Sequence, residues 1–210
     1  SGERVVREAQ AVGSLGHRNI VQATNAGRID QISYHVREYV QGRNLGRCVV
    51  DDGPFTRRDA CSLLRQAAQG LRCAHENGFV HRDVKPDNVM LTPAHRVVVM
   101  DFGLVLPEFD VSGQQRVAGS PPYMAPEAML NTATTGSGHL ADIFGLGVVA
   151  YELLTGKRPY GGATIRRGVA SPQGPPPRQL AQLPPDCPPE PCPGVPEKPH
   201  ADPHGPPPRP

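Results

Sequence analysis

Two short polar segments contain the residues of this sequence whose types and spacing suit chemistry. Residues 81–88, with the sequence HRDVKPDN, hold acids, cations and an amide, and residues 101–103, DFG, add a further acid. A site for phosphoryl transfer must position and neutralise a highly charged phosphate chain. It therefore needs oxygen ligands for a metal, a cation and an acceptor for a hydroxyl proton. The two segments together supply these residue types.

The order of the motifs resembles that of the eukaryotic-like protein kinases. The HRDVKPDN segment is followed thirteen residues after Asn88 by DFG, and later by APE at residues 125–127. Taken singly, an Asp or Asn in a loop usually caps a turn, and a Lys there is usually a solvated charge. An ordered set of motifs is much harder to produce by coincidence, so the resemblance indicates a serine/threonine protein kinase of bacterial type.

The resemblance implies a role for each polar residue in phosphoryl transfer from ATP. Asp83 would orient the substrate hydroxyl and accept its proton, and Lys85 would steady the transferred phosphoryl group. Asn88 and Asp101 would hold Mg²⁺, a hard ion that prefers oxygen ligands. Lys85, together with Ser120 in a segment similar to the family's substrate-facing loop, favours protein substrates that present serine or threonine.

The same resemblance implies where ATP would be held. Glu8 occupies the position of the helix-C glutamate that pairs with the ATP-binding lysine of the family. The carbonyl of Glu38 and the backbone of Val40 would meet the adenine, and Asn44 would face the ribose. Met90 would form the apolar floor under the base.

Two features depart from the family pattern. The sequence begins inside the segment that resembles helix C, so neither the glycine-rich phosphate loop nor the ATP-binding lysine is in it, and Glu8 has no partner. Arg37 stands where the family commonly has an apolar residue beside the adenine. A guanidinium at that position would need an acid or water to satisfy it.

Two further residues are implied to support the site. Asp142, in the segment ADIFGLG, is similar to the helix-F aspartate that holds the backbone of the catalytic loop, and a buried carboxylate needs such partners. Ser112 lies between DFG and APE, where a phosphate could pair with Arg82 and order the loop. A loop serine that is never modified fits the sequence equally well.

Hydrophobic periodicity predicts the elements that must position these segments. Thr56 and Asp59 have the spacing of a capping box, and the apolar stripe that follows them ends at Asn77-Gly78. The remaining patterns predict helices over 3–15 and 141–154, and short strands within 29–39, 89–91 and 96–100. We therefore expect an α+β chain. By resemblance it is a protein-kinase-like fold with an incomplete N-lobe, made of helix C and the last strands, and a mainly helical C-lobe.

A change in composition divides the chain near Gly161. Of the 25 prolines, 8 precede this residue and 17 follow it, where large apolar residues are few. Such a segment cannot bury enough surface to offset the entropy of ordering it, so we expect residues 161–210 to be a proline-rich, disordered tail. Residues 1–45 would then form a partial N-lobe and hinge, and residues 46–160 a C-lobe with the catalytic and activation loops.

The tail supports two interpretations. It could be a proline-rich linker that binds a polyproline-recognising domain. Alternatively, a frame shift or gene decay just after Glu190 produced it, because residues 183–190, LPPDCPPE, still resemble the entry to the next kinase helix.

Charge and composition bear on the other partners. The formal net charge of +2, without a long Lys/Arg block, argues against nucleic acid or an anionic membrane as the main partner. The sequence contains no run of about 18 apolar residues, the length that is needed to span a bilayer. The five cysteines form no CxxC pair, so neither a disulfide framework nor a zinc site is indicated. We expect a cytoplasmic, reducing location and no membrane segment within this chain.

Three functions are compatible with these observations. The motifs favour an ATP- and Mg²⁺-dependent serine/threonine kinase, here as an incomplete domain. A catalytically silent, kinase-like binding module and a decayed fragment are the alternatives. Intact Asp83, Lys85, Asn88 and Asp101 favour the enzyme, whereas the missing phosphate loop and lysine disfavour activity of these residues alone.

Overall fold

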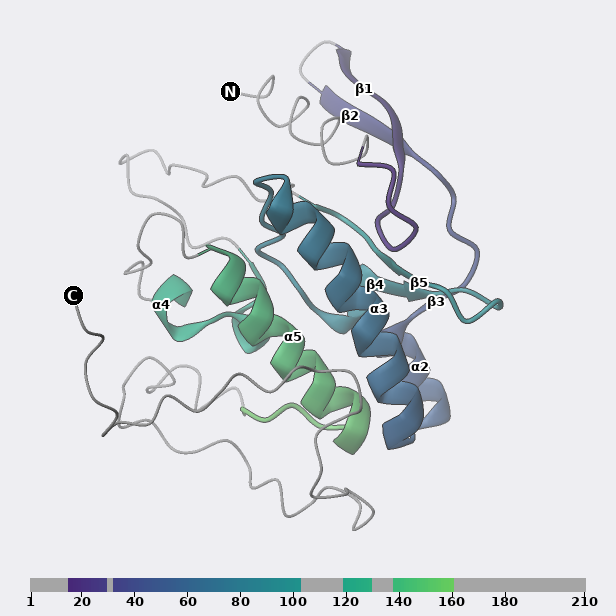
Figure 1. Cartoon of the computed structure of the whole chain (residues 1–210), viewed down its shortest axis with the longest axis vertical. Helices are drawn as coiled ribbons and strands as arrows, with labels where there is room; N and C mark the ends of the chain where they lie inside the picture. The colour runs from purple at the N-terminus through teal and green to yellow at the C-terminus, as the bar shows by residue number, and fades with distance from the viewer. Residues whose placement is uncertain (1–14, 30–31, 103–118, 130–137, 161–210) are drawn as a thin grey trace, which may run out of the picture.

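The computed structural model describes residues 15–29, 32–102, 119–129 and 138–160 (Figure 1). The predicted helix over 3–15, apart from its last residue, and the tail 161–210 lie outside the described residues. The same holds for the candidate residues Glu8 and Ser112.

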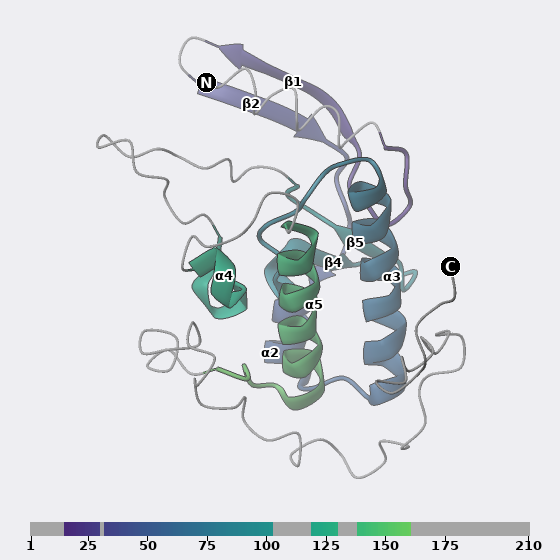
Figure 2. The ribbon, with the colours of Figure 1, turned by 60° about the vertical axis from the view of Figure 1, so that its left-hand side comes forward.

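An antiparallel hairpin forms the first described element. Strand β1 (Ala23–Ile29) pairs with β2 (Ile32–Arg37), and the register runs from Ala23 opposite Arg37 to Ile29 opposite Ile32. Figures 1 and 2 both show this hairpin at one end of the molecule, beyond the helices. The sequence pattern predicted strand structure within 29–39, which β2 confirms. It missed β1, because the sequence ATNAGRI has no apolar alternation.

The segment before the hairpin is tied to strand β5 (Val97–Val99). The Val21 N–H donates to the Val99 carbonyl at 3.0 Å, and the Val99 N–H donates to the Asn19 carbonyl at 2.9 Å. Helix α3 (Arg57–Glu76) also approaches closely here, because a Cβ on its Gly70 would lie only 2.6 Å from the Asn19 carbonyl oxygen. The base of the hairpin is thereby fixed against the helical part of the chain.

Helix α3 forms as its capping pattern predicts. The Thr56 hydroxyl accepts a hydrogen bond from the Asp59 N–H at 3.2 Å, which satisfies one of the free donors at the helix start. The helix ends at Glu76 with Asn77 as its C-cap, and Gly78 follows with a φ of 81°. Its apolar stripe is buried along Ala60, Leu63, Ala67, Leu71 and Ala74.

Helix α5 (Gly138–Thr155) packs beside α3, as Figure 2 shows. The predicted helix over 141–154 is confirmed, and Gly156 follows its end with a φ of 68°. Leu153 is fully buried and Val149 almost so, and both belong to the core that also contains the buried stripe of α3. The two helices therefore form the support for the loops between them.

A three-stranded antiparallel sheet lies under the polar loops. Its order is β3 (Arg43–Asn44), β4 (Val89–Leu91) and β5, and all three valines of β5 are buried. The β4–β5 pair is the predicted hairpin. Strand β3 was not predicted, because two residues carry no periodic pattern.

The remaining elements are short. Helix α2 (Leu45–Asp52) was not predicted, because a segment of eight residues is too short to mark a helix by its pattern. Single turns follow at η1 (Pro86–Asn88), η2 (Pro121–Tyr123) and α4 (Pro126–Met129). Within the described ranges, no helix combines the length and the apolar character that crossing a bilayer demands.

Candidate active site

The loop at residues 81–88 is held to helix α5 by the buried carboxylate of Asp142. This carboxylate accepts hydrogen bonds from the backbone N–H groups of His81, at 2.8 Å, and Arg82, at 2.7 Å. The Nε2 atom of His75 lies 2.8 Å from the same carboxylate. Arg82 has a φ of 67°, which is uncommon for a residue other than glycine, so the loop needs such fixed partners. The predicted anchoring role of Asp142 is confirmed.

Close packing brings the same loop onto α5. An added Cβ on Gly145 would lie 3.1 Å from the Val84 carbonyl oxygen and 3.1 Å from its Cβ. The glycine thus lets the loop backbone approach the helix directly.

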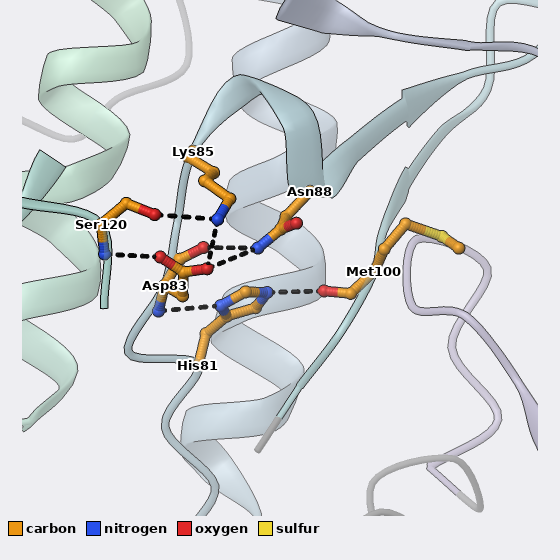
Figure 3. A network of polar contacts seen from close by, with 6 residues as sticks. All are labelled: His81, Asp83, Lys85, Asn88, Met100 and Ser120. Atoms are coloured by element: carbon orange, nitrogen blue, oxygen red, sulfur yellow. Dashed lines mark hydrogen bonds and ion pairs between the residues drawn. The ribbon is translucent and has the colours of Figure 1, made fainter. Parts of the chain in front are cut away.

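His81 connects the loop at 81–88 to the segment that contains Asp101. Its Nε2 donates to the Met100 carbonyl at 2.7 Å, and its Nδ1 accepts from the Asp83 N–H at 3.2 Å (Figure 3). These two bonds require the neutral imidazole. Burial lowers the pKa of His81, which agrees with this neutral form. The ring also packs edge-on against Phe102, with centroids 4.6 Å apart.

The carboxylate of Asp83 is the centre of a polar network (Figure 3). Its Oδ2 lies 2.7 Å from the Lys85 Nζ, and its Oδ1 accepts from the Ser120 N–H at 2.9 Å. Lys85 also donates to the Ser120 hydroxyl at 2.8 Å, so the segment that begins at residue 119 is drawn against the loop. Partial burial acts to raise the pKa of Asp83, but the hydrogen bonds from Lys85 and Ser120 outweigh it, and the pKa lies below its ordinary value. Asp83 is therefore an ionised acceptor at neutral pH.

Asn88 lies on the other side of Asp83. Its Nδ2 donates to the Asp83 carbonyl at 2.9 Å and to the Asp83 Oδ2 at 3.1 Å, and the side chain is buried. Because both amide contacts are made by the nitrogen, the amide oxygen points away from Asp83. The Met100 N–H donates to the Asn88 carbonyl at 2.8 Å, which brings the next residue, Asp101, beside this part of the loop.

Asp101 is paired with Arg37, from the end of β2. The Arg37 Nη1 donates to the Asp101 Oδ1, and both side chains are about one-third exposed. The acid that the sequence required beside Arg37 is thus Asp101. The backbone of Asp101 has a φ of 55°, so this residue, like Arg82, departs from the usual backbone regions.

The donor set suits Mg²⁺ as far as the protein contributes to it. Asn88 and Asp101 offer an amide oxygen and a carboxylate, and Mg²⁺ keeps several waters while binding one or two carboxylates together with substrate phosphates. Among the described residues, no three His, Cys, Asp or Glu gather as a metal site of their own. Any metal here would therefore depend on phosphate oxygens as well as on the protein.

The residues predicted around adenine and ribose lie along the sheet and the hairpin. Val40 is buried, and Met90 packs against the small apolar cluster to which Val40 belongs. Asn44 lies opposite Met90 in the sheet, and its Oδ1 caps helix α2 by accepting the Arg47 N–H at 2.7 Å. The Glu38 N–H donates to the Gln22 carbonyl at 2.9 Å. The structure therefore groups Val40, Met90 and Asn44, and gives Asn44 a structural contact as well.

Sequence reasoning missed two residues that hold the site together. The contacts of His81 were not anticipated, although the residue was visible within the HRD motif. The Tyr123 hydroxyl donates to the Glu152 carboxylate of α5 at 2.6 Å. Burial and, to a smaller extent, this hydrogen bond raise the pKa of Tyr123 above its ordinary value. No local pattern marks that pair, because 29 residues separate its members.

The ionised acid, its lysine and the neighbouring amide lie on loops between two packed helices, which is an arrangement suited to phosphoryl transfer. Residues 1–172 match the protein kinase domain family, and the chain belongs to this family. The fold and the family predicted from the motifs are confirmed.

Similar proteins include several bacterial kinases. The chain is 39% identical over 168 residues to the probable serine/threonine-protein kinase PknB of Corynebacterium glutamicum, covering 76% of this chain and 26% of that protein. It is 37% identical over 161 residues to the serine/threonine-protein kinase PrkC of Bacillus subtilis, covering 76% of this chain and 24% of that protein. The chain thus spans about a quarter of the length of these curated relatives.

A solved structure shows the same fold. The crystal structure of Rad53, residues 1–466, in complex with AMP-PNP matches with a TM-score of 0.63 and 28% sequence identity. The match covers 76% of this chain and 40% of the Rad53 chain.

Proposed function

We propose that this chain is the catalytic part of a serine/threonine protein kinase that transfers the γ-phosphate of ATP to protein hydroxyls. The observation that carries the proposal is the Asp83 network. An ionised carboxylate, a lysine and a loop serine are held within 2.9 Å of one another by side chains and backbone. Such a pre-positioned set is what phosphoryl transfer requires of a protein.

Each residue has a definite part in the proposed reaction. The substrate hydroxyl oxygen forms a bond to the γ-phosphorus while the bond from that phosphorus to the bridging oxygen breaks, so ADP leaves with the electron pair. Asp83 orients the hydroxyl and receives its proton. Lys85, 2.7 Å from Asp83, is close enough to neutralise the charge of the transferred group.

The nucleotide would lie between the sheet and the hairpin. Val40 and Met90 offer an apolar surface for adenine, and the backbone of Glu38 and Val40 would meet its polar edge. Asn88 and Asp101 would hold Mg²⁺, which when bound neutralises phosphate charge. The Lys85 bond to Ser120 places the segment from residue 119 beside Asp83, which supports a serine or threonine substrate at that position.

A kinase-like binding module without catalysis is the second candidate. The ion pair between Arg37 and Asp101 favours it, because one of the proposed metal ligands already has a cation as partner.

For either function we propose a cytoplasmic location, supported by five cysteines without a CxxC pair. We also propose that the proline-rich segment 161–210 binds a polyproline-recognising domain.

The test is transfer of labelled phosphate from ATP in the presence of Mg²⁺, using the protein with its natural flanking sequence. Asp83→Asn should abolish labelling of the protein itself and of an added generic protein substrate. Glu76→Gln, a surface acid paired with Arg72 on α3, is the matched control and should label like the wild type.

Two results would contradict parts of this proposal. Labelling by Asp83→Asn at the wild-type rate would refute the proposed role of this carboxylate. Nucleotide binding without any transfer by the wild-type protein would instead support the binding module.

A further inference from the structure

Arg37 reaches from the hairpin to the segment that follows the sheet. It is the last residue of β2, and its guanidinium donates to the Asp101 carboxylate 64 positions further along the chain. The base of the hairpin is fixed on both sides of this contact. The Glu38 N–H bonds to the Gln22 carbonyl at 2.9 Å, and the Val21 N–H bonds to strand β5. The pair therefore joins the hairpin to the segment that follows β5.

The two acids of the site are paired in different ways. Asp83 has Lys85 from its own loop, two residues away, as its cation. Asp101 has a cation supplied by a different element, the hairpin. The pairing of Asp83 is thus built into one loop, whereas that of Asp101 depends on where Arg37 lies.

Arg37 and a metal would compete for the same carboxylate. An oxygen that accepts a hydrogen bond from a guanidinium has less electron density to offer a metal, and a divalent ion nearby is repelled by the fixed positive charge. A movement of the Arg37 side chain away from Asp101 would relieve this competition.

We propose that Arg37 sets the metal affinity of the site by holding the Asp101 carboxylate until a divalent cation displaces it. Arg37 is then a positioning residue that acts through Asp101. This inference rests on the proposed function, because it takes Asp101 as a metal ligand. The opposing view is that an ion pair exposed to this degree is a minor surface contact without effect on the metal, as many such pairs are.

Direct binding of Mn²⁺, measured from the electron paramagnetic resonance signal of the free ion, separates these views. Titrations would be made with AMP-PNP present and absent, on the protein with its natural flanking sequence. Arg37→Met keeps the length of the side chain but removes the charge, and should bind Mn²⁺ roughly tenfold more tightly than the wild type. Arg37→Lys retains the charge and should restore an affinity close to that of the wild type.

Two more variants make the result specific. Arg72→Met removes an exposed arginine paired with Glu76 on α3, and should leave Mn²⁺ binding unchanged. Asp101→Asn should abolish tight binding in both the wild type and the Arg37→Met background. Circular dichroism of each variant confirms that the fold is intact before its titration is used.

The outcomes distinguish the proposed role of Arg37 from the proposed metal site at Asp101. Equal or weaker Mn²⁺ binding by Arg37→Met, while Asp101→Asn still loses it, would overturn the role of Arg37 and uphold the metal site. Binding by Arg37→Lys as tight as by Arg37→Met would also overturn it, because the charge would not be the cause. Mn²⁺ binding that Asp101→Asn leaves unaltered would overturn both the metal site and the role of Arg37.

Discussion

Replacing Asp142 by Asn should loosen the active-site loop and destabilise the whole chain. Asp142 is 1% exposed, and its carboxylate accepts hydrogen bonds from the backbone N–H groups of His81 and Arg82 through different oxygens. An Asn side chain has only one oxygen. Whichever way its amide turns, at least one of these two N–H groups then faces an NH₂ group and loses its acceptor.

The magnitude follows from that one lost bond. Leaving a buried donor without a partner costs about 1–3 kcal/mol, and the acceptor lost here is charged, so we expect a decrease of about 2 kcal/mol in the free energy of unfolding. For a chain of this size, this corresponds to a fall of about 4–8 °C in Tm. Differential scanning calorimetry of Asp142→Asn against the wild type measures it directly.

The matched control for this substitution is Glu76→Gln, which makes the same chemical change at an exposed acid of α3. Its Tm should equal that of the wild type. An Asp142→Asn variant whose Tm lies within about 1 °C of the wild type would refute the claim that this carboxylate holds the loop backbone.

Three further predictions concern the elements around the site. Burial lowers the pKa of His81, so between the folded and unfolded pKa values the unfolded chain binds a proton at this residue and the folded chain does not. The free energy of unfolding should therefore fall as the pH drops below the pKa of an unfolded histidine, about 6.5. Urea unfolding at pH 8 and pH 5.5 should show this loss, and His81→Gln should reduce the difference between the two pH values. Leu153→Ala removes a fully buried side chain between the helices and should lower the free energy of unfolding by about 2–5 kcal/mol in urea titrations, whereas an unchanged midpoint would contradict the observed core. Thr56→Ala removes the cap of α3 and should cost about 1 kcal/mol by the same measurement, with Thr56→Ser close to the wild type.

The helices could be predicted because their signals are local. Helix α3 has a capping residue, a continuous apolar stripe and an Asn-Gly end, and α5 is apolar over most of its length. Strands β1 and β3 could not be predicted, because each is defined by the partner it pairs with and not by its own alternation. A two-residue strand such as β3 exists only through its bonds to β4.

The same difference between local patterns and contacts over long sequence distances applies to the candidate site. The residues proposed to carry the chemistry, Asp83, Lys85 and Asn88, lie within one motif, and the resemblance of that motif to the catalytic loop of the protein kinases identified them. The partner of Arg37 could be anticipated only as some acid, because the contact with Asp101 joins positions 64 residues apart. His81 was passed over, because burial and its bond to the Met100 carbonyl depend on the tertiary packing of two loops.

A crystal structure of the protein with AMP-PNP and Mg²⁺ tests the central claim most directly. We predict that the metal lies between the Asn88 amide oxygen and the Asp101 carboxylate, with the γ-phosphate directed at Asp83 and the Arg37 side chain moved off Asp101. A metal held by other residues, or a nucleotide bound away from Asp83, would contradict the account.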